Sequence, residues 1–285
     1  MKKVIVDVYG GIGNQIFQYV FAKYLEDQGF KISISTAYNK VHNNKNVISR
    51  DTILNPLIFG FNDIFWIYKY LFKFFDSRFY QFLDKNKTFI NKFVKEFSWQ
   101  NERNFNLENF ETLNRVTGHW QFVDLMLNYK EFVINSLAKL YNDQNIRKII
   151  PFDNKVAVHV RRGDYIGLNK NLSLKYYEQA LSEIEKKLTN FEFEVFSDDI
   201  EWAKNQRVFL NANKFWDYED GEKVNLRDFK ELLNFKHLII SNSTFSLIPA
   251  LFNSSFNGIV VFPENWLSEE IAKINNKNWI CAVND

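Results

Sequence analysis

The feature that most constrains this chain is a repeated alternation between short β-branched runs and longer segments with helical spacing. Residues 4–8 read Val-Ile-Val-Asp-Val and predict a buried strand. Residues 15–29 then place apolar side chains on one helical face and end at a glycine, which predicts a helix. Residues 31–35 predict a second strand. A strand–helix–strand opening of this kind is typical of a parallel sheet.

The alternation returns after a polar stretch at residues 142–154, which contains Pro151. One further helix is expected before that stretch, over residues 120–141. After it, the sequence predicts strands at residues 156–160, 192–196, 237–240 and 258–262, and helices at residues 175–188, 200–206, 226–235 and 245–252. Strands that alternate with helices predict an α/β fold with a doubly wound parallel sheet.

The polar stretch is also the best candidate for a domain boundary. At ~100–200 residues per domain, a chain of 285 residues forms two domains or one large one. Hydrophobic residues make up 46% of the chain and charged residues 25%, which is enough apolar material to bury a core in each half. We therefore predict one domain over residues 1–150 and a second over residues 151–285.

Residues 51–97 differ from the rest of the first half, because they are dense in aromatic residues and lysine. One explanation is a helical insertion that buries one face in the N-terminal domain. The other is a basic, aromatic face that lies on an anionic membrane surface. The lysines that would supply its charge are Lys69, Lys73, Lys85, Lys87, Lys92 and Lys95.

Composition excludes several classes of protein. A single cysteine, Cys281, excludes a disulfide framework and a cysteine-based metal cage. The four histidines form no zinc-binding pair, and a net charge of +2 is too small to indicate a nucleic-acid binder. No apolar run reaches the ~18 residues of a membrane span, and residues 1–8 lack the apolar core of a signal peptide. We therefore expect a cytoplasmic protein, with peripheral contact at the inner face of the plasma membrane left open.

Four polar clusters follow predicted strands, at the carboxyl ends where open α/β sheets bind ligands. The first, residues 10–15, reads Gly-Gly-Ile-Gly-Asn-Gln, and its glycines allow a tight turn and a close ligand. It is neither a P-loop nor a dinucleotide fingerprint, because no Lys-Ser/Thr pair follows and residue 16 is isoleucine. The alternative is a plain strand-to-helix turn. Asn14 and Gln15, at the predicted helix start, favour a polar ligand.

The second cluster, residues 159–165, reads His-Val-Arg-Arg-Gly-Asp-Tyr. Of two adjacent arginines at a strand end, one is expected to turn inward, and a guanidinium fork matches a pair of phosphate oxygens. Asp164 is placed either to orient an arginine or to accept a proton. The alternative for the whole cluster is a structural Arg–Asp ion pair.

The two remaining clusters both precede predicted helices. Residues 197–199 read Ser-Asp-Asp and are best explained as an N-cap with an acidic first turn. Residues 241–246 read Ser-Asn-Ser-Thr-Phe-Ser, and their hydroxyls either cap the helix or hold a phosphate together with the N–H groups at its start. Upstream, Asp228 either accepts hydrogen bonds from a base edge or is a solvated charge on a helix.

Arginines, hydroxyls and a helix start together indicate a diphosphate ligand. No Asp-x-Asp run follows a predicted strand to hold a divalent metal, and Asp198-Asp199 comes nearest. An arginine would then neutralise a departing nucleoside diphosphate in place of a metal ion.

The four motifs, in this order over nearly the whole chain, resemble those of the α-1,2-fucosyltransferases of glycosyltransferase family 11. The resemblance implies a GT-B fold, in which two Rossmann-like domains face a central cleft. The N-terminal domain would take the acceptor, and the C-terminal domain would bind GDP-L-fucose. It also implies inversion at the anomeric carbon, no metal or other cofactor, no nucleic-acid partner, and a galactose-containing acceptor in O-antigen, lipopolysaccharide or capsule synthesis.

A likeness to α-1,6- and protein O-fucosyltransferases implies individual roles. Arg161 would contact the β-phosphate, Ser243 or Thr244 would hold phosphate, and Asp228 would hold the guanine. Asn14 would face the reacting centre. The residues expected to bind the donor are Gly11, Gly13, His159, Arg161, Arg162, Asp228, Ser243, Thr244 and Phe245. Those expected to act in catalysis are Asp164, Arg161 and Asn14.

Three residues are candidates for the general base that takes the acceptor's proton. Asp164 is the first candidate, ahead of His159 and Asp7, and orienting an arginine is an equally supported role for it. Two other functions stay open for the chain. One is a glycosyltransferase of another linkage or donor, and the other is a non-catalytic module that binds a nucleotide or a sugar.

Overall fold

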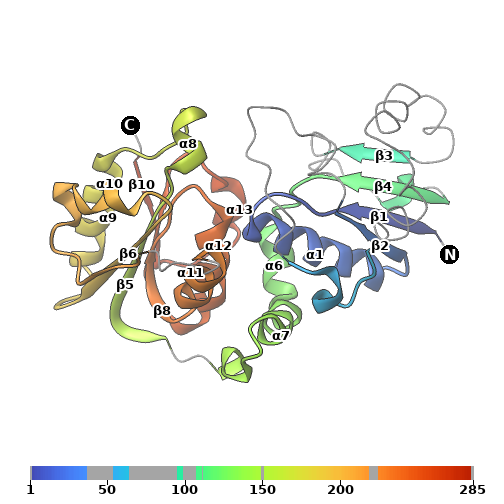
Figure 1. Cartoon of the computed structure of the whole chain (residues 1–285), viewed down its shortest axis with the longest axis horizontal. Helices are drawn as coiled ribbons and strands as arrows, with labels where there is room; N and C mark the ends of the chain where they lie inside the picture. Colours follow the sequence, from blue (N-terminus) through green and yellow to red (C-terminus); the bar gives the residue numbers. More distant parts are fainter. Residues whose placement is uncertain are drawn as a thin grey trace. The chain divides into compact units, whose positions relative to one another are not determined.

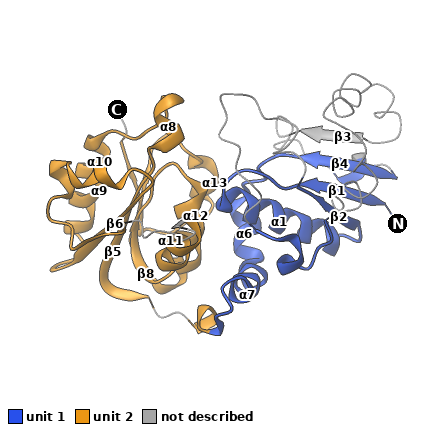
Figure 2. Cartoon of the chain, viewed as in Figure 1, with its two compact units in different colours: residues 1–144 blue, residues 145–285 orange. Residues whose placement is uncertain are grey.

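The computed structural model describes residues 2–36, 54–63, 95–98, 107–110, 112–148, 151–217 and 224–283 (Figure 1). The chain divides into two compact units, residues 1–144 and residues 145–285 (Figure 2). The division falls inside the polar stretch of residues 142–154, a few residues before the predicted boundary. Each unit has its own parallel sheet, so each is described by itself.

Unit 1 is built on a four-stranded sheet in the order β2-β1-β4-β3, and every pair of neighbours is parallel. The central pair is β1 and β4, with Val6 opposite Val116. The described elements of the unit are β1 (Lys3–Asp7), α1 (Ile12–Asp27), β2 (Lys31–Ser35), a 3-10 turn (Pro56–Phe59), β3 (Lys95–Ser98), a second 3-10 turn (Leu107–Asn109), β4 (Leu113–Thr117), α6 (Val123–Asn128) and α7 (Lys130–Leu140).

Helix α1 starts within the glycine motif, three residues earlier than the apolar spacing predicts. Gly11 is its N-cap, and Gly13 and Asn14 lie in its first turn. Of the three glycines in the motif, Gly10 alone has a positive φ, 81°, so the tight turn depends on that position. The helix buries eleven of its sixteen residues, which ties the motif rigidly to the core of the unit.

Strand β4 lies at the centre of the sheet, yet the sequence pattern did not predict it. Its residues Asn114 and Arg115 break the apolar run that marks a buried strand. Both find partners in β1: the Asn114 amide donates to the Lys3 carbonyl at 3.2 Å, and Arg115 pairs with Asp7. The single helix predicted over residues 120–141 is two helices, α6 and α7, separated at Tyr129.

Unit 2 is built on a six-stranded sheet in the order β10-β9-β8-β5-β6-β7, again with every pair parallel. If β5 to β10 are numbered 1 to 6, the order read from the β7 edge is 3-2-1-4-5-6, which is the strand order of a doubly wound sheet. Its elements are β5 (Phe152–Val160), α8 (Gly163–Gly167), α9 (Leu174–Glu185), β6 (Glu192–Ser197), α10 (Ile200–Lys204), β7 (Lys214–Phe215), α11 (Val224–Leu232), β8 (Phe235–Ile239), α12 (Thr244–Asn253), β9 (Val260–Pro263), α13 (Ser268–Ala272) and β10 (Trp279–Ala282); 3-10 turns lie at Gln144–Lys148, Arg207–Phe209 and Ser254–Phe256.

The side chains of β5 alternate between the two faces of this sheet. Val158 and Val160 pack with Tyr176 and Tyr177 of α9 in the main core. His159 points to the opposite face, where it contacts Ser246 of α12. Figure 1 shows the same division, with α9 and α10 on one face of the sheet and α11 and α12 on the other. Helices therefore cover both faces, as a doubly wound sheet requires.

Two parallel α/β units, each with helices that cross between strands, confirm the predicted α/β fold of the GT-B type with two Rossmann-like domains. The predicted helices of residues 51–97 fall largely on positions outside the described residues; residues 54–63 and 95–98 carry a 3-10 turn and β3 instead. Among the described helices, none combines the length and the apolar character needed to cross a bilayer.

Candidate active site

The candidate site of unit 2 lies where β5 and β8 end side by side. On one side of this pair the strands continue as β6 and β7, and on the other as β9 and β10, so the chain reverses its winding direction here. Open parallel sheets bind ligands at such a switch point, beyond the carboxyl ends of the strands. The His-Val-Arg-Arg motif ends β5, and the Ser-Asn-Ser-Thr motif follows β8. The fold thus brings these two predicted clusters to one place, and Asp198 of a third cluster reaches them from the end of β6.

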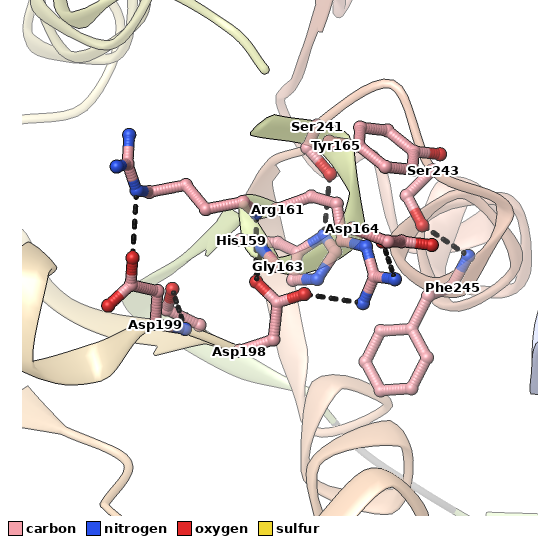
Figure 3. A network of polar contacts seen from close by, with 12 residues as sticks. His159, Arg161, Gly163, Asp164, Tyr165, Asp198, Asp199, Ser241, Ser243 and Phe245 are labelled. Atoms are coloured by element: carbon pink, nitrogen blue, oxygen red, sulfur yellow. Dashed lines mark hydrogen bonds and ion pairs between the residues drawn. The ribbon is translucent and has the colours of Figure 1, made fainter. Parts of the chain in front are cut away.

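Arg161 follows β5 directly, and two carboxylates hold its guanidinium (Figure 3). Its Nη1 lies 2.6 Å from Asp198 Oδ2, and its Nη2 contacts Asp164 Oδ1. The side chain is only 15% exposed, and its guanidinium lies 5.2 Å from the centre of the Tyr165 ring. Arg161 is therefore a fixed, partly buried cation at the switch point, with the fork geometry that suits a phosphate.

Arg162 takes a separate set of partners. Its Nε lies 3.1 Å from Asp199 Oδ2, and its guanidinium stacks on the Trp202 ring at 3.6 Å. Both partners belong to the loop after β6 and to α10. The two adjacent arginines thus have different partners, but both side chains are mostly buried, at 15% and 16% exposed, rather than one of them alone turning inward. Arg161 binds acidic groups at the switch point, whereas Arg162 ties the end of β5 to α10, and its role in donor binding stays a prediction.

The two aspartates after β6 have different roles, which the sequence did not predict. Asp199 is the N-cap of α10 and accepts a hydrogen bond from the Trp202 backbone N–H, as predicted for this cluster. Asp198 does not cap the helix. It accepts from the backbone N–H groups of Arg162 and Gly163, at 2.8 and 3.2 Å, and pairs with Arg161. The signal available in the sequence was an extra aspartate beyond the one that an N-cap needs.

His159 is buried and neutral. Its Nδ1 lies 2.8 Å from Ser241 Oγ and 2.9 Å from Ser246 Oγ, so it ties β5 to both the end of β8 and the first turn of α12. Burial, reinforced by the positive charge of Arg161, lowers the pKa of His159 to about 3. The imidazole is thus a neutral hydrogen-bonding link within the site, and it is a poor proton acceptor near pH 7.

Helix α12 presents its N-terminus at the same strand ends. Ser243 is its N-cap and accepts a hydrogen bond from the Phe245 backbone N–H at 3.3 Å (Figure 3). Thr244 begins the helix and is buried, and the Phe245 ring lies 5.3 Å from the His159 ring. Of the two explanations for these hydroxyls, capping is present for Ser243. A helix start beside Arg161's motif also supplies the dipole and N–H groups that favour an anion.

Asp228, predicted to hold the guanine, lies in α11 and is 6% exposed, so it is not a solvated surface charge. The guanidinium of the neighbouring Arg227 donates to its Oδ1 through Nε at 3.0 Å and Nη2 at 2.9 Å. Phe229, next in the helix, packs edge-on against Phe245 at 5.5 Å. This ring contact places α11 beside the start of α12, and the role of Asp228 toward a base stays a prediction.

The glycine motif belongs to unit 1, where β1 and β4 end side by side. Two buried glutamines hold its loop. Gln15 donates to the Gly10 carbonyl at 2.7 Å and accepts from the Leu54 N–H, and Gln18 accepts from the Tyr9 N–H and donates to the Gly118 carbonyl, both at 2.9 Å. Asn14 accepts a hydrogen bond from Gln121 Nε2 at 3.0 Å. The predicted residue Asn14 thus lies in an amide pair, which the sequence did not indicate.

Asp7, a minor candidate for the general base, is fully buried at the end of β1. Arg115 binds it through two bonds, of 2.9 and 3.0 Å, and the Thr117 hydroxyl donates to it as well. Because its oxygens are all engaged by these donors, Asp7 is a structural anion of unit 1. Within the described residues, no three His, Cys, Asp or Glu side chains gather as a metal site would need.

Comparison with known proteins found two relatives from Escherichia coli that match almost end to end. One, an O-antigen biosynthesis glycosyltransferase named WbnK, is 26% identical over 95% of this chain and 97% of its own length. The other, an alpha-1,2-colitosyltransferase, is 28% identical over 95% of this chain and 94% of its own length.

Two solved structures also match. E. coli heptosyltransferase WaaC with ADP has a TM-score of 0.42 and 10% identity, covering 99% of this chain and 93% of its own. NodZ alpha-1,6-fucosyltransferase soaked with GDP-fucose has a TM-score of 0.42 and 13% identity, covering 88% of this chain and 92% of its own.

Among protein families, the model described as Glycosyl transferase family 11 matches residues 3–282, which is nearly the whole chain and includes all four motifs. The match agrees with the resemblance carried by those motifs, and it removes the non-catalytic module from the functions left open. The chain belongs to glycosyltransferase family 11 and is a glycosyltransferase.

Proposed function

We propose that this protein is an inverting α-1,2-fucosyltransferase, which moves L-fucose from GDP-L-fucose to a hydroxyl of a terminal galactose-type sugar. The acceptor belongs to a surface glycan such as O-antigen, lipopolysaccharide or capsule. The observation that carries the proposal is Arg161, a partly buried cation fixed by two carboxylates at the switch point of the unit 2 sheet. The relative named for O-antigen biosynthesis supports the assignment to surface glycans.

Unit 2 holds the donor in this proposal. Arg161 neutralises the diphosphate, and the N–H groups at the start of α12, with Ser243 and Thr244, bind its oxygens. Asp228 takes the guanine edge, beside Phe245. A guanidinium and a helix start together offset the charge that develops on the leaving group, so no metal ion is needed for this step.

Unit 1 takes the acceptor in this proposal. A sugar is neutral and rich in hydroxyls, so amide side chains that both donate and accept are suitable partners. Asn14 and Gln121 supply two such groups at the ends of β1 and β4. Gln15 and Gln18 keep the loops around them in place.

The reaction is a single displacement. The acceptor oxygen forms a bond to the anomeric carbon of fucose, the bond from that carbon to the β-phosphate oxygen breaks, and GDP leaves with the electron pair. The acceptor hydroxyl gives its proton to Asp164 if that carboxylate is the base, and otherwise to an oxygen of the departing diphosphate. Two roles for Asp164 predict different kinetics: a base that takes this proton, or a carboxylate that orients Arg161. Its contact with Arg161 Nη2 supports the second.

A second candidate donor is GDP-colitose, favoured by the relative named as an alpha-1,2-colitosyltransferase. Colitose is L-fucose without the hydroxyl at C3. The nucleotide and the two phosphates are the same in both donors, so the unit 2 site suits either one. Discrimination would then depend on whether a protein group hydrogen-bonds the 3-hydroxyl.

The test is a turnover screen with purified full-length protein. GDP-L-fucose, GDP-colitose, GDP-mannose and UDP-galactose are each offered with galactosides, and the linkage of every product is determined. We expect the highest kcat/KM with GDP-L-fucose and an α-1,2 bond in the product. Preference for GDP-colitose would move the assignment to the second candidate, and a different linkage would refute the first.

A further inference from the structure

We propose that Asp198 is the positioning residue that sets the Arg161 guanidinium for the diphosphate. The inference rests on the proposed function, because it assumes that Arg161 binds this group. Asp198 follows β6, whereas Arg161 follows β5, and the two strands are parallel neighbours with Val160 opposite Ser197. The carboxylate therefore reaches across from a neighbouring strand to hold the cation (Figure 3).

Both oxygens of Asp198 are used. Oδ2 lies 2.6 Å from Arg161 Nη1, and Oδ1 accepts from two consecutive backbone N–H groups, those of Arg162 and Gly163. Backbone donors at the end of a strand and the start of a helix are fixed by the fold. The carboxylate is consequently anchored before it meets the arginine, and charge-assisted bonds of this kind are among the stronger hydrogen bonds in proteins.

Asp164 holds the other edge of the same guanidinium in a different way. It lies in α8, three residues after Arg161, and one of its oxygens contacts Nη2. Its bond to Arg161 is local to one loop and helix turn. Asp198 instead joins the ends of two strands, so it is the group that fixes where the cation stands relative to the sheet. With one carboxylate at each terminal nitrogen, the plane of the guanidinium is fixed, and its remaining N–H groups stay aligned for an anion.

Gly163 provides an independent sign of this fit. A Cβ added at Gly163 would lie 2.6 Å from Asp198 Oδ2, the same oxygen that pairs with Arg161. Any side chain at this position would therefore push the carboxylate away from the guanidinium. The glycine is needed here for space rather than for its φ, which is not among the positive values. Helix α8 also contains Gly167, where an added Cβ would meet nothing within 4 Å.

The experiment measures GDP binding by calorimetry, together with kcat and KM for the donor, in full-length variants. Asp198→Asn keeps the size of the side chain and removes its charge. We expect a loss of GDP affinity of about 10–100-fold, the range for removing a charged hydrogen-bond partner. Glu201→Gln is the control, since it removes a carboxylate from neighbouring α10 that is 75% exposed and pairs with Lys204; its GDP affinity should change less than twofold.

The same substitution in an Arg161→Ala background separates positioning from other roles. If Asp198 acts through Arg161, Asp198→Asn should cost less than about twofold once the guanidinium is gone. An equal loss in both backgrounds would overturn the proposal, as would an Asp198→Asn protein that binds GDP like the unmodified one. If Arg161→Ala itself left GDP binding intact, the proposed donor site would fail instead, so the two failures are distinct.

A second pair of variants tests the proposal even if the Asp198→Asn protein does not fold. Gly163→Ala leaves every charge in place but displaces the Asp198 carboxylate, so it should weaken GDP binding by a similar factor. Gly167→Ala, in the same short helix, should bind GDP within about twofold of the unmodified protein. Thermal midpoints establish that both proteins are folded. Equal GDP affinity in the two glycine variants would contradict the proposal.

Discussion

The two sheets of this protein end in sites of opposite chemical character. In unit 1, the uncharged amide side chains of Gln15 and Gln18 hold the loops after β1 and β4 through hydrogen bonds, and the Asn14–Gln121 pair lies beside them. In unit 2, the loops after β5 and β6 are held by bonds between arginines and aspartates. Both places are the carboxyl ends of adjacent parallel strands. The topology of the sheet determines where a ligand binds, and the side chains at that place determine which kind of ligand binds there.

Unit 1 also contains a pair of charged side chains, but that pair connects two strands of the sheet. Asp7 is fully buried and bound by Arg115 and Thr117, so the pair joins β1 to β4. In unit 2, the Asp164 and Asp198 side chains around Arg161 stay 28% and 23% exposed. Asp7 is a fully buried carboxylate that favours one arrangement of the sheet, although the Arg115 side chain that binds it is 35% exposed. A cation held by partly exposed carboxylates can exchange a partner for a ligand, which the proposed donor site requires.

The largest expected effect comes from the cation of unit 2. Arg161→Lys keeps the charge and removes the fork, so kcat/KM should fall ~30–1000-fold, equivalent to ~2–4 kcal/mol of transition-state stabilisation. Steady-state kinetics with GDP-L-fucose, beside calorimetric GDP binding, provide the measurement. Near-normal kcat/KM would show that the charge alone suffices and would remove the proposed bidentate role.

The matching test in unit 1 is Gln121→Leu, which removes the donor to Asn14. We expect the KM for the galactoside acceptor to rise ~5–30-fold with GDP affinity unchanged, because the variant loses one hydrogen bond of ~1–2 kcal/mol in unit 1 and leaves the charged groups of unit 2 intact. Gln28→Leu, at an exposed position at the end of α1, is the control. A loss of GDP affinity would mean that the two sites are not chemically separate.

A pH prediction concerns the neutral group inside the charged site. Because burial lowers the pKa of His159 to about 3, the unfolded chain binds a proton that the folded chain does not between pH 3 and the ordinary value of 6.5. Stability from this residue is complete above pH 6.5 and is lost as pH falls through that window. The loss between pH 7.5 and 5.5 should be on the order of 1 kcal/mol.

Urea unfolding at pH 7.5 and 5.5 checks this prediction, with His159→Gln as the comparison. Burial also lowers the pKa values of His119 and His237, and both remain in the variant. The variant should be less stable at both pH values, but its stability should fall by about 1 kcal/mol less on acidification. An identical pH dependence in the two proteins would show that His159 is not buried neutral.

Asp164→Asn tests a smaller effect, since Asp198 still holds Arg161. We expect GDP affinity and kcat to fall together by about 3–10-fold, the size of a partly exposed ion pair at the upper end of its range. A general base would behave otherwise: kcat would fall ~10²–10⁴-fold while GDP affinity is kept. That outcome would assign the proton transfer to Asp164 and would refute the orienting role.

The smallest expected effect is that of metal removal. If Arg161 and the start of α12 offset the charge of the leaving diphosphate, saturating EDTA should change kcat by less than about twofold. Added Mn²⁺ and Mg²⁺ should have an equally small effect. Loss of activity on chelation, restored by Mn²⁺, would instead implicate Asp198 and Asp199 as metal ligands.

Much of the fold could be predicted because its signals are local. The short apolar runs of β1, β2, β5, β6, β8 and β9, the helical spacing of α1 and the helical segments of α9 and α12 were all evident in the sequence. The strands that were missed are those whose signal is not local. Strand β4 has polar residues that are satisfied only by β1, and β7 is two residues long. Strand β10 lies at the edge of its sheet, where the apolar pattern is weak.

By itself, the sequence determined the α/β class, the four motifs and the membership of glycosyltransferase family 11. Only the tertiary structure decided which carboxylates meet Arg161. Asp164 and Asp198 are three and thirty-seven residues away in the chain, and the parallel pairing of β5 with β6 makes them neighbours of one guanidinium. The tertiary structure likewise decided that Asn14 pairs with Gln121, across the ends of β1 and β4. Sequence patterns report the periodicity of single segments, whereas a site forms where the ends of different segments converge, and pairing between strands sets that convergence.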